Sequence, residues 1–420
     1  FLPIATLQIQ SAAFRFLIDV RNDSTERKRI ISNIYFFLVP SSFFSLLILF
    51  FFLYKIEFLT RLLIVIYFFV DIIMMGTQQI IRGLSNNKLF SISAIIQSVV
   101  NMILIVLTIS IAEQGLNGIL ISIIVATTIS VFVLIVKGGV ITEIDFRLIS
   151  IDIIKQMLGY SWPMIPNTLS NWVLSMSDRL VLTVFIGIEA IAVYGVANKI
   201  PQLLGTIQGT FIFAWQENAS LVVSDNDAEK YYSDMFDHIY CIVMGFLAVL
   251  IGAAPILFKV LIRGDYGDAY PQMSILFLGI FFNMISAFLG GIYVAHKRTK
   301  NVGITTMIAA ICNLAIDLAL VNYIGIYAAS VSTVFSYLFL VIYRMHDIKK
   351  FQTMIYKYGK IAYTLAILLG MCVICWINLT LLNFFNFAIG FIFAIILNWN
   401  LIKTLWSRFI RKCSIMSTLP

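Results

Sequence analysis

The chain has 420 residues, of which 60% are hydrophobic and 12% are charged, and its net charge is +8. Soluble globular proteins carry about 25% charged residues, so this chain has too little polar side chain to cover a fold of its size in water. The composition excludes a water-soluble enzyme and a nucleic-acid-binding module, because most of the surface must face lipid.

Twelve apolar runs, separated by charged or turn residues, are the predicted membrane spans. Each must be a helix, because backbone polar groups in hydrocarbon need partners within their own segment. A segment of mixed character, 144–158, is predicted to be a helix on the cytoplasmic surface that joins the two halves. The chain opens inside an apolar stretch at Phe1, and we expect further sequence before it. In chain order the predicted spans are 30–53, 58–81, 89–111, 115–136, 160–186, 190–214, 232–254, 271–295, 302–322, 324–343, 358–377 and 384–405.

The basic residues are distributed unevenly over the connections between these spans. Of the 29 Lys and Arg residues, 23 lie in alternate connections, beginning with the one that carries Arg15, and four lie in the intervening connections. Cytoplasmic loops of membrane proteins are enriched in Lys and Arg. We therefore expect the first connection and the C-terminal tail to lie in the cytoplasm.

Similar residues recur in the two halves of the chain. Asn101 lies within one span and Gly115 opens the next, while Asn313 and Gly325 hold the same places at offsets of 212 and 210 residues. Six spans separate the copies, so both have the same orientation and the halves are predicted to be related by an axis along the membrane normal. By this offset, one whole span and most of another precede Phe1.

Charged residues within the predicted spans are the first functional candidates. An ionised side chain near the middle of a bilayer costs about 3 kcal/mol, so it is rarely kept without a role. These residues are Asp71, Asp178, Arg179, Lys199 and Asp317. The three aspartates are candidates for carrying a coupling ion, although pairing, snorkelling or capping would explain Asp71 and Asp317 as well.

One predicted span presents a polar face. Asn167, Asn171, Ser175 and Asp178 follow one another at intervals of four, four and three residues, so they share one side of a helix. We expect this side to face water or a polar substrate. The alternative is that these residues hold helices together by hydrogen bonds.

Two cations lie at similar depth in neighbouring spans. Arg179 is seven residues and Lys199 nine residues from the outer ends of their spans, and both could bind phosphate or another anion. The alternative is that Asp178 simply neutralises one of them. Because the chain has no nucleotide-binding motif and no metal-ligand spacing, we expect neither a cofactor nor a metal site.

The region beginning at Tyr160 resembles a known family. Its sequence YSWPMIPNTLSNWVLSMSDRLVLTVFIGIEAIAVYGVANKIPQLL, followed by FIFAWQENAS, is similar to the middle of Wzx-type polysaccharide flippases of the multidrug, oligosaccharidyl-lipid and polysaccharide exporter superfamily. The segment AAFRFL, which contains Arg15, is similar to the basic end of that family's second helix, and Arg15 is therefore a further substrate-binding candidate.

The resemblance implies an all-α polytopic membrane protein of fourteen helices. It would have two pseudo-symmetric six-helix lobes and two extra C-terminal helices, with the first helix and most of the second missing from this chain. The corresponding domains are residues 1–140 for the truncated N-terminal lobe, 141–345 for the C-terminal lobe and 346–420 for the last two helices and the tail.

The resemblance also implies a function in the bacterial cytoplasmic membrane. The protein would move a polyprenyl-diphosphate-linked oligosaccharide to the outer leaflet for capsule, O-antigen or exopolysaccharide assembly. Arg179 and Lys199 would bind the diphosphate, Asn167 and Asn171 the sugar hydroxyls, and a proton or sodium ion could drive the cycle, with a polysaccharide polymerase as a possible partner. Three alternatives stay open: a flippase for peptidoglycan or teichoic acid precursors, a cation-coupled drug antiporter, and a membrane polysaccharide polymerase.

Overall fold

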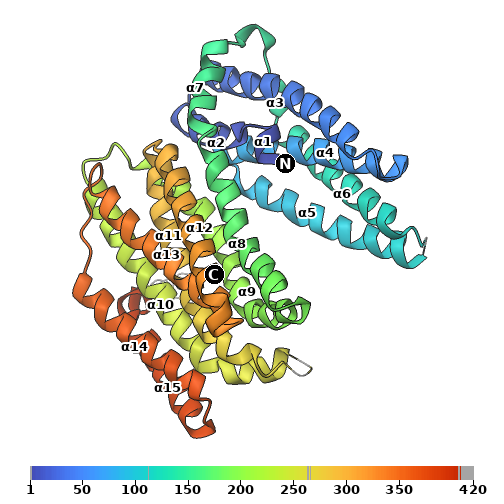
Figure 1. The fold of residues 1–420 in the computed structure, drawn as a ribbon. Helices are drawn as coiled ribbons and strands as arrows, with labels where there is room; N and C mark the ends of the chain where they lie inside the picture. Colours follow the sequence, from blue (N-terminus) through green and yellow to red (C-terminus); the bar gives the residue numbers. More distant parts are fainter. Residues whose placement is uncertain (1, 112, 263, 265, 405–406, 408–420) are drawn as a thin grey trace, which may run out of the picture. The chain divides into compact units, whose positions relative to one another are not determined.

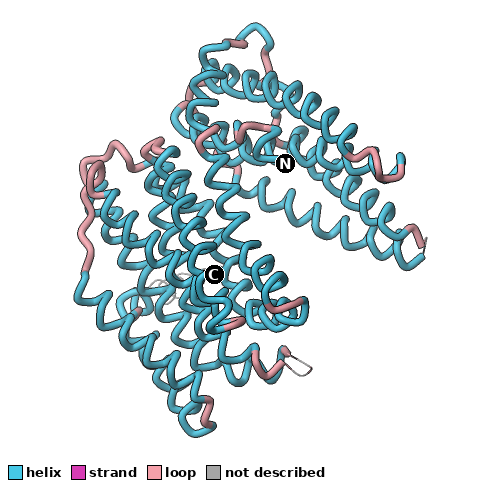
Figure 2. The backbone as a smooth tube through the Cα atoms, viewed as in Figure 1, coloured by secondary structure: helices cyan, strands magenta, loops and turns pink. Residues whose placement is uncertain are grey.

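A computed structural model describes residues 2–111, 113–262, 264, 266–404 and 407. Its regular structure in these residues is helical, and short loops join the helices (Figures 1 and 2). The predicted all-α class is confirmed. In chain order the longer helices are α2 (Ile9–Asp19), α3 (Ser24–Phe52), α4 (Phe58–Gly83), α5 (Asn87–Ile105), α6 (Gly115–Lys137), α7 (Ile151–Ser161), α8 (Met164–Phe185), α9 (Ile188–Leu221), α10 (Ala228–Leu261), α11 (Ala269–Ala295), α12 (Thr299–Ile324), α13 (Tyr327–Ile348), α14 (Tyr358–Ile377) and α15 (Thr380–Leu397).

Ten of the described helices are long and apolar enough to cross a membrane. Each of the twelve predicted spans coincides with a helix, but α8 and α9 are not among these ten. The polar face predicted from Asn167 to Asp178 lies on α8, which explains its low hydropathy. The two predicted spans that are not among the ten are therefore those that carry Asp178, Arg179 and Lys199.

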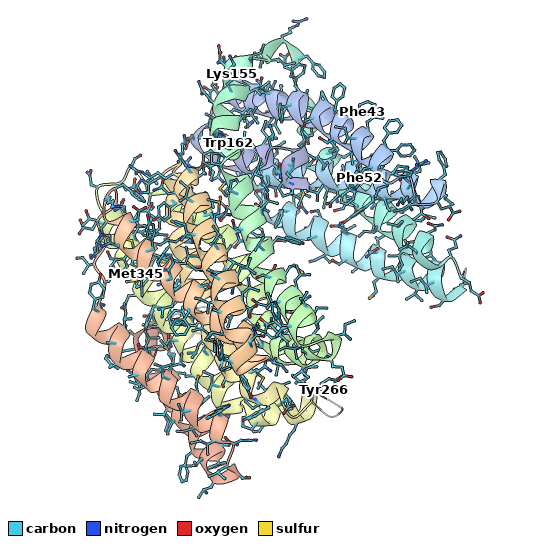
Figure 3. The ribbon with its side chains drawn as sticks, in the orientation of Figure 1. Phe43, Phe52, Lys155, Trp162, Tyr266 and Met345 are labelled. Carbon is cyan, nitrogen blue, oxygen red and sulfur yellow. The ribbon has the colours of Figure 1, made fainter. Side chains whose placement is uncertain are left out.

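Many large apolar side chains on the long helices are exposed, as expected of a surface that faces lipid. Phe43 and Phe52 on α3 are 60% and 80% exposed, and Figure 3 shows both directed away from the neighbouring helices. The hydrophobic effect does not drive helices together within lipid, so van der Waals packing and interhelical hydrogen bonds must hold the spans in place.

The described residues form two compact units. Unit 1 comprises residues 1–169 and 294–304, and unit 2 comprises residues 170–293 and 305–420. One boundary falls inside α8, and the turn between α11 and α12 belongs to unit 1 although most of both helices belongs to unit 2. The pseudo-symmetric lobes predicted from the repeat remain predictions, as does the cytoplasmic C-terminal tail, most of which lies outside the described residues.

Within unit 1, α4 packs closely against α2. A Cβ atom added at Gly83 would lie 2.7 Å from the Cβ of Leu17, so glycine is required for this approach. The predicted surface helix begins only at Ile151, because Asn33 on α3 holds the preceding residues in an extended conformation. The side chain of Asn33 donates to the carbonyl of Leu148 at 3.1 Å and accepts from the amide of Ser150 at 2.8 Å.

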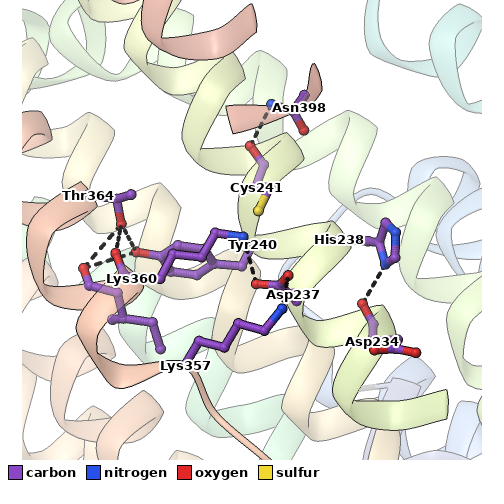
Figure 4. Close-up of polar contacts among 10 residues, drawn as sticks. Asp234, Asp237, His238, Tyr240, Cys241, Lys357, Lys360, Thr364 and Asn398 are labelled. Atoms are coloured by element: carbon purple, nitrogen blue, oxygen red, sulfur yellow. Dashed lines mark hydrogen bonds and ion pairs between the residues drawn. The ribbon is translucent and has the colours of Figure 1, made fainter. Parts of the chain in front are cut away.

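Within unit 2, the last two helices are anchored on α10. At one end, Asp237 accepts from Lys357 and Lys360 at 2.9 and 2.8 Å (Figure 4). Nearer the other end, a Cβ added at Gly252 would lie 2.6 Å from the Cα of Phe387, so α15 contacts α10 backbone to backbone. Ion pairs and small-residue packing together fix α14 and α15.

Candidate functional site

A cavity of about 320 Å³ lies within unit 2, among α8, α9, α11 and α13. Its wall is built from polar and apolar side chains. The polar members are Ser175, Asp178, Arg179, Tyr194, Asn198, Gln202, Asn283, Thr333 and Tyr337. A cavity with one aspartate, one arginine and several amide and hydroxyl groups is equipped to bind a polar or anionic ligand.

Helix α8 contributes the two charged residues of this wall. Asp178 is 3% exposed and Arg179 is half-buried. Of the other polar-face residues, Ser175 lines the cavity, whereas Asn167 and Asn171 do not. Asn167 belongs to unit 1 and Asn171, which is exposed, to unit 2. Thus only the later part of the predicted polar face contributes to the cavity.

Neutral donors surround the Asp178 carboxylate. The hydroxyl of Tyr194 donates to Oδ2 at 2.6 Å, and the hydroxyl of Thr333 donates to the same oxygen at 2.9 Å. The alternative in which Asp178 forms an ion pair with Arg179 or Lys199 has no such contact to support it among the described residues. Among the described residues, the Asp178 carboxyl group is therefore bound by neutral donors and not by a cation.

Asn313 on α12 connects the carboxylate to the neighbouring helices. In the amide orientation that satisfies all its neighbours, its nitrogen donates to Ser177 Oγ at 2.9 Å and to Asp178 Oδ1 at 3.3 Å. Its oxygen then accepts from Ser332 Oγ at 3.2 Å and from the amide of Thr333 at 3.3 Å. Helices α8, α12 and α13 are thus tied together at the position of Asp178.

Asp317 lies one turn beyond Asn313 on α12 and has an unusual environment. It is 0% exposed, and neither carboxylate oxygen has a hydrogen-bond donor among the described residues. Asp317 is close enough to Asp178 and Tyr194 to interact with them electrostatically. A buried carboxylate without a partner costs several kcal/mol unless it holds a proton or a cation. The pair Asp178 and Asp317 is therefore a candidate site for a positively charged ligand.

The two predicted cations have different positions. Arg179 lines the cavity and makes no ion pair with a described residue. Lys199 on α9 is exposed and is not part of the cavity wall. The structure thus brings Arg179, but not Lys199, next to Asp178 in this cavity.

Arg15 is occupied by contacts within unit 1. Its guanidinium is buried, donates to the carbonyl of Ala295 at 3.0 Å and forms an ion pair with Asp19. Asp19 in turn accepts from Lys297 at 2.8 Å. Burial alone would raise the pKa of Asp19, but the hydrogen bonds from Lys297 and Arg15 outweigh it and lower the pKa below its usual value. These contacts attach the α11–α12 turn to α2.

Asp71, the third candidate for ion coupling, lies in α4 in unit 1. It is half-buried, one turn after Tyr67, and makes no ion pair with a described residue. It is not among the residues that line the cavity of unit 2. Its role stays a prediction.

Several residues of the site were not predicted from sequence. Tyr194 and Thr333 bind Asp178 but lie on different helices, and nothing in their spacing points to that contact. The four-residue step from Asn313 to Asp317 can be seen in the sequence, but helix packing is the commoner explanation of such a pair. A mid-span asparagine one turn before an aspartate was the available signal.

Comparison with known proteins identifies a family and a set of similar folds. The model of the family described as polysaccharide biosynthesis protein matches residues 1–217. No curated protein matches the chain significantly. Among solved structures, an outward-facing multidrug resistance MATE family transporter of the MOP superfamily is 13% identical, with a TM-score of 0.68, and the match covers 83% of this chain and 86% of that one.

Two further structures have similar folds. A MOP superfamily transporter from Pyrococcus furiosus is 13% identical, with a TM-score of 0.64 over 83% of this chain and 85% of that one. A Vibrio cholerae MATE transporter is 12% identical, with a TM-score of 0.66 over 83% of this chain and 86% of that one. At these identities the similarity shows the fold alone.

Proposed function

We propose, from the premise that this chain belongs to the polysaccharide biosynthesis protein family, that it moves a lipid-linked oligosaccharide across the cytoplasmic membrane of a bacterium. The chain is a multi-pass membrane protein, and its MATE-like fold points to a transporter rather than an enzyme. The proposed cargo is a polyprenyl-diphosphate-linked repeat unit destined for capsule, O-antigen or exopolysaccharide. Its lipid tail can remain in the bilayer, so only the diphosphate and sugars need a polar path.

The observation that carries this proposal is Arg179 in the wall of the unit 2 cavity. It is half-buried and has no ion pair with a described residue, so its charge is available to an anionic ligand. A guanidinium suits phosphate because its planar donors match two phosphate oxygens at once. The cavity wall also contains the amide groups of Asn198, Gln202 and Asn283 and the hydroxyl group of Tyr337. These groups can form hydrogen bonds with sugar hydroxyls.

A cation at Asp178 and Asp317 would couple transport to an ion gradient. Among the described residues Asp317 has no hydrogen-bond donor and Asp178 is bound only by neutral groups, so a proton or a sodium ion would neutralise one of the two negative charges. One charge moving through 100 mV supplies about 2.3 kcal/mol. Because Arg179 follows Asp178 directly, binding of the anion and of the cation would influence one another.

Two related functions use the same fold. A flippase for peptidoglycan or teichoic acid precursors would need the same anion site. A drug antiporter would use the acidic pair without a free arginine, so Arg179 favours the anionic cargo over a cationic drug. In each case alternating access by movement of the lobes is the expected cycle.

Replacing Arg179 by Gln tests the proposal. A charge-assisted hydrogen bond contributes about 1.5 to 3 kcal/mol, so substrate affinity should fall about ten- to a hundredfold in Arg179→Gln. Lys199→Gln is the matched control, because Lys199 is exposed and lies outside the cavity wall. The measurement is surface polysaccharide in a flippase-null strain, relative to membrane protein level. Full export by a stable Arg179→Gln protein would disprove the anion site.

A further inference from the structure

A second and larger cavity lies in unit 2, away from the proposed transport site. Its volume is about 650 Å³, and it is bounded by residues of α10, α11, α14 and α15 and of the turn between the last two. Its lining includes Lys259, Tyr270, Trp376, Asn378, Asn383 and Phe384. None of these residues lines the cavity that contains Arg179.

This cavity lies toward one membrane surface. Lys259 is 22 residues beyond Asp237 on α10, and at 1.5 Å per residue this is about 33 Å along the helix. That length matches the hydrocarbon thickness of a bilayer, about 30 Å. Asp237 is held by Lys357 and Lys360, which belong to a connection that the basic residues assign to the cytoplasm. The end with Lys259 is then at the outer surface.

The helices that form the wall of this cavity contact one another directly. At one end of α14, Asp237 holds Lys357 and Lys360, and Gly252 allows Phe387 on α15 to approach α10 closely (Figure 4). Tyr270 on α11 contacts Cys375 on α14, with 3.3 Å between the hydroxyl and the Sγ atom. All four helices of the wall are therefore held by direct contacts.

Polar groups without partners lie at the mouth of this cavity. Lys259 is exposed and forms no ion pair with a described residue. Asn383 donates from its amide nitrogen to Asn378 at 2.8 Å, but its Oδ1 atom is buried and has no donor. In the described part of its wall, the cavity thus offers the positive charge of Lys259 and one acceptor that needs a hydroxyl or N–H group.

The rest of the wall is aromatic and open to lipid. Trp376 and Phe384 are 59% and 72% exposed. Tryptophan is enriched where the hydrocarbon meets the headgroups, because its ring is apolar and its N–H is polar. A ligand here would therefore have an apolar chain as well as a charged, hydroxyl-bearing head.

We propose that this cavity binds an anionic glycerophospholipid from the outer leaflet. Its phosphate would accept a hydrogen bond from Lys259, a hydroxyl of its headgroup would donate to Asn383 Oδ1, and an acyl chain would lie along Trp376 and Phe384. Lys259, the one basic residue among the described residues of the wall, balances the one negative charge of a phosphodiester, whereas a polyprenyl diphosphate carries more negative charge than Lys259 alone neutralises. The bound lipid would fasten α14 and α15 to α10 and α11 at the outer surface.

Lipid binding by the purified full-length protein tests this proposal. Phosphatidylglycerol, phosphatidylcholine or polyprenyl phosphate is added to the protein in detergent, and retained lipid is counted by native mass spectrometry. We expect phosphatidylglycerol to be retained most, with about tenfold weaker binding by Lys259→Gln and recovery in Lys259→Arg. Lys55→Gln is the matched control, because Lys55 is the other described lysine assigned to the outer surface.

The outcomes separate the possible ligands. Equal retention of phosphatidylglycerol by wild type and Lys259→Gln would overturn the proposal, as would equal binding of phosphatidylcholine. Stronger binding of polyprenyl phosphate would instead assign the cavity to a carrier lipid and would also overturn it. Because binding is measured without transport, none of these results depends on the proposed flippase activity.

Discussion

The two copies of the predicted repeat differ in charge at matching positions. Asn101 on α5 corresponds to Asn313 on α12 at an offset of 212 residues, and by the same offset Ile105 corresponds to Asp317. On the following helix, where the offset is 210, Ile123 on α6 corresponds to Thr333 on α13. The first copy therefore has isoleucine at two positions where the second copy has polar residues of the site.

The contacts around the matching polar residues differ as well. In the first copy, Gln97 on α5 donates to Thr127 on α6 at 2.9 Å. Ser122 on α6 binds Thr108 hydroxyl to hydroxyl at 2.9 Å, and Thr108 lies in the π-helical segment Val106–Ile111 that follows α5. In the second copy, Asn313 connects Asp178 to α13, and Asp317 lies beyond it without a donor. The matching positions thus make contacts between helices in the first copy and surround two buried carboxylates in the second.

The largest expected effect comes from removing the charge of Asp317. We expect Asp317→Asn to reduce export at least about a hundredfold and to abolish stabilisation by the coupling cation. For wild type, a cation at 100 times its Kd would add about 2.7 kcal/mol to the free energy of unfolding. Thermal unfolding with sodium exchanged for choline, at several pH values, measures this. An unchanged cation response in Asp317→Asn would contradict the site.

Introducing a charge at the corresponding position of the first copy should lower the stability of the folded protein. Ile105→Asp would place a carboxylate in a span that offers it no basic partner among the described residues, at a cost of about 3 kcal/mol. We expect a severalfold loss of folded protein in the membrane, measured by fluorescence-detected size exclusion. Ile105→Asn is the control, because it is polar without the charge. Normal yield of Ile105→Asp would indicate that the first copy also accommodates an ion.

The two matching asparagines should respond differently to loss of the amide. Asn313→Leu removes a donor to Asp178 and the hydrogen-bond partner of the Ser177 hydroxyl, so we expect a loss of about 1 to 3 kcal/mol. Asn101→Leu should be nearly neutral, because the Oδ1 atom of Asn101 is buried without a donor. The difference in melting temperature between the two variants measures this contrast, and equal losses would contradict it.

The smallest expected effect concerns Asp19. The pKa of Asp19 is lower in the folded state than in the unfolded state, where it is about 3.9. The ion pairs of Asp19 with Arg15 and Lys297 therefore stabilise unit 1 fully at pH values above the unfolded-state pKa. This contribution is lost as the pH falls through the folded-state pKa. Asp19→Asn should therefore cost at most about 1 kcal/mol, given its partial exposure. The loss should be the same at pH 6 and pH 8, and a loss that grew between them would assign another titrating group.

The spans could be predicted from sequence because each depends on a local property. The α14 span was predicted at 358–377, the residues it occupies, since a long apolar run in lipid must form its own backbone hydrogen bonds. The start of α7 could not be predicted, because Asn33, more than a hundred residues earlier, holds the residues before Ile151. Local composition carries no information about such a distant hydrogen bond.

The candidate site was only partly predictable for the same reason. Asp178, Arg179 and Asp317 stood out because ionised residues are rare within apolar spans. Whether Asp178 pairs with a cation or with neutral donors depends on Tyr194 and Thr333, which reach it from two other helices. Likewise, Arg179 and Lys199 looked equivalent by depth, but only Arg179 lines the cavity.

The sequence by itself determined that this is a helical membrane protein and which residues carry charge into the spans, because both follow from hydropathy along the chain. The family resemblance also lay in contiguous motifs, and the match to residues 1–217 confirmed it at the level of the family. Only the tertiary structure decided that Asp317 has no donor in the described part of the chain and that Arg179 lines the cavity while Lys199 does not. Those facts depend on how distant helices pack, since each partner of a buried polar group is supplied by a different part of the chain.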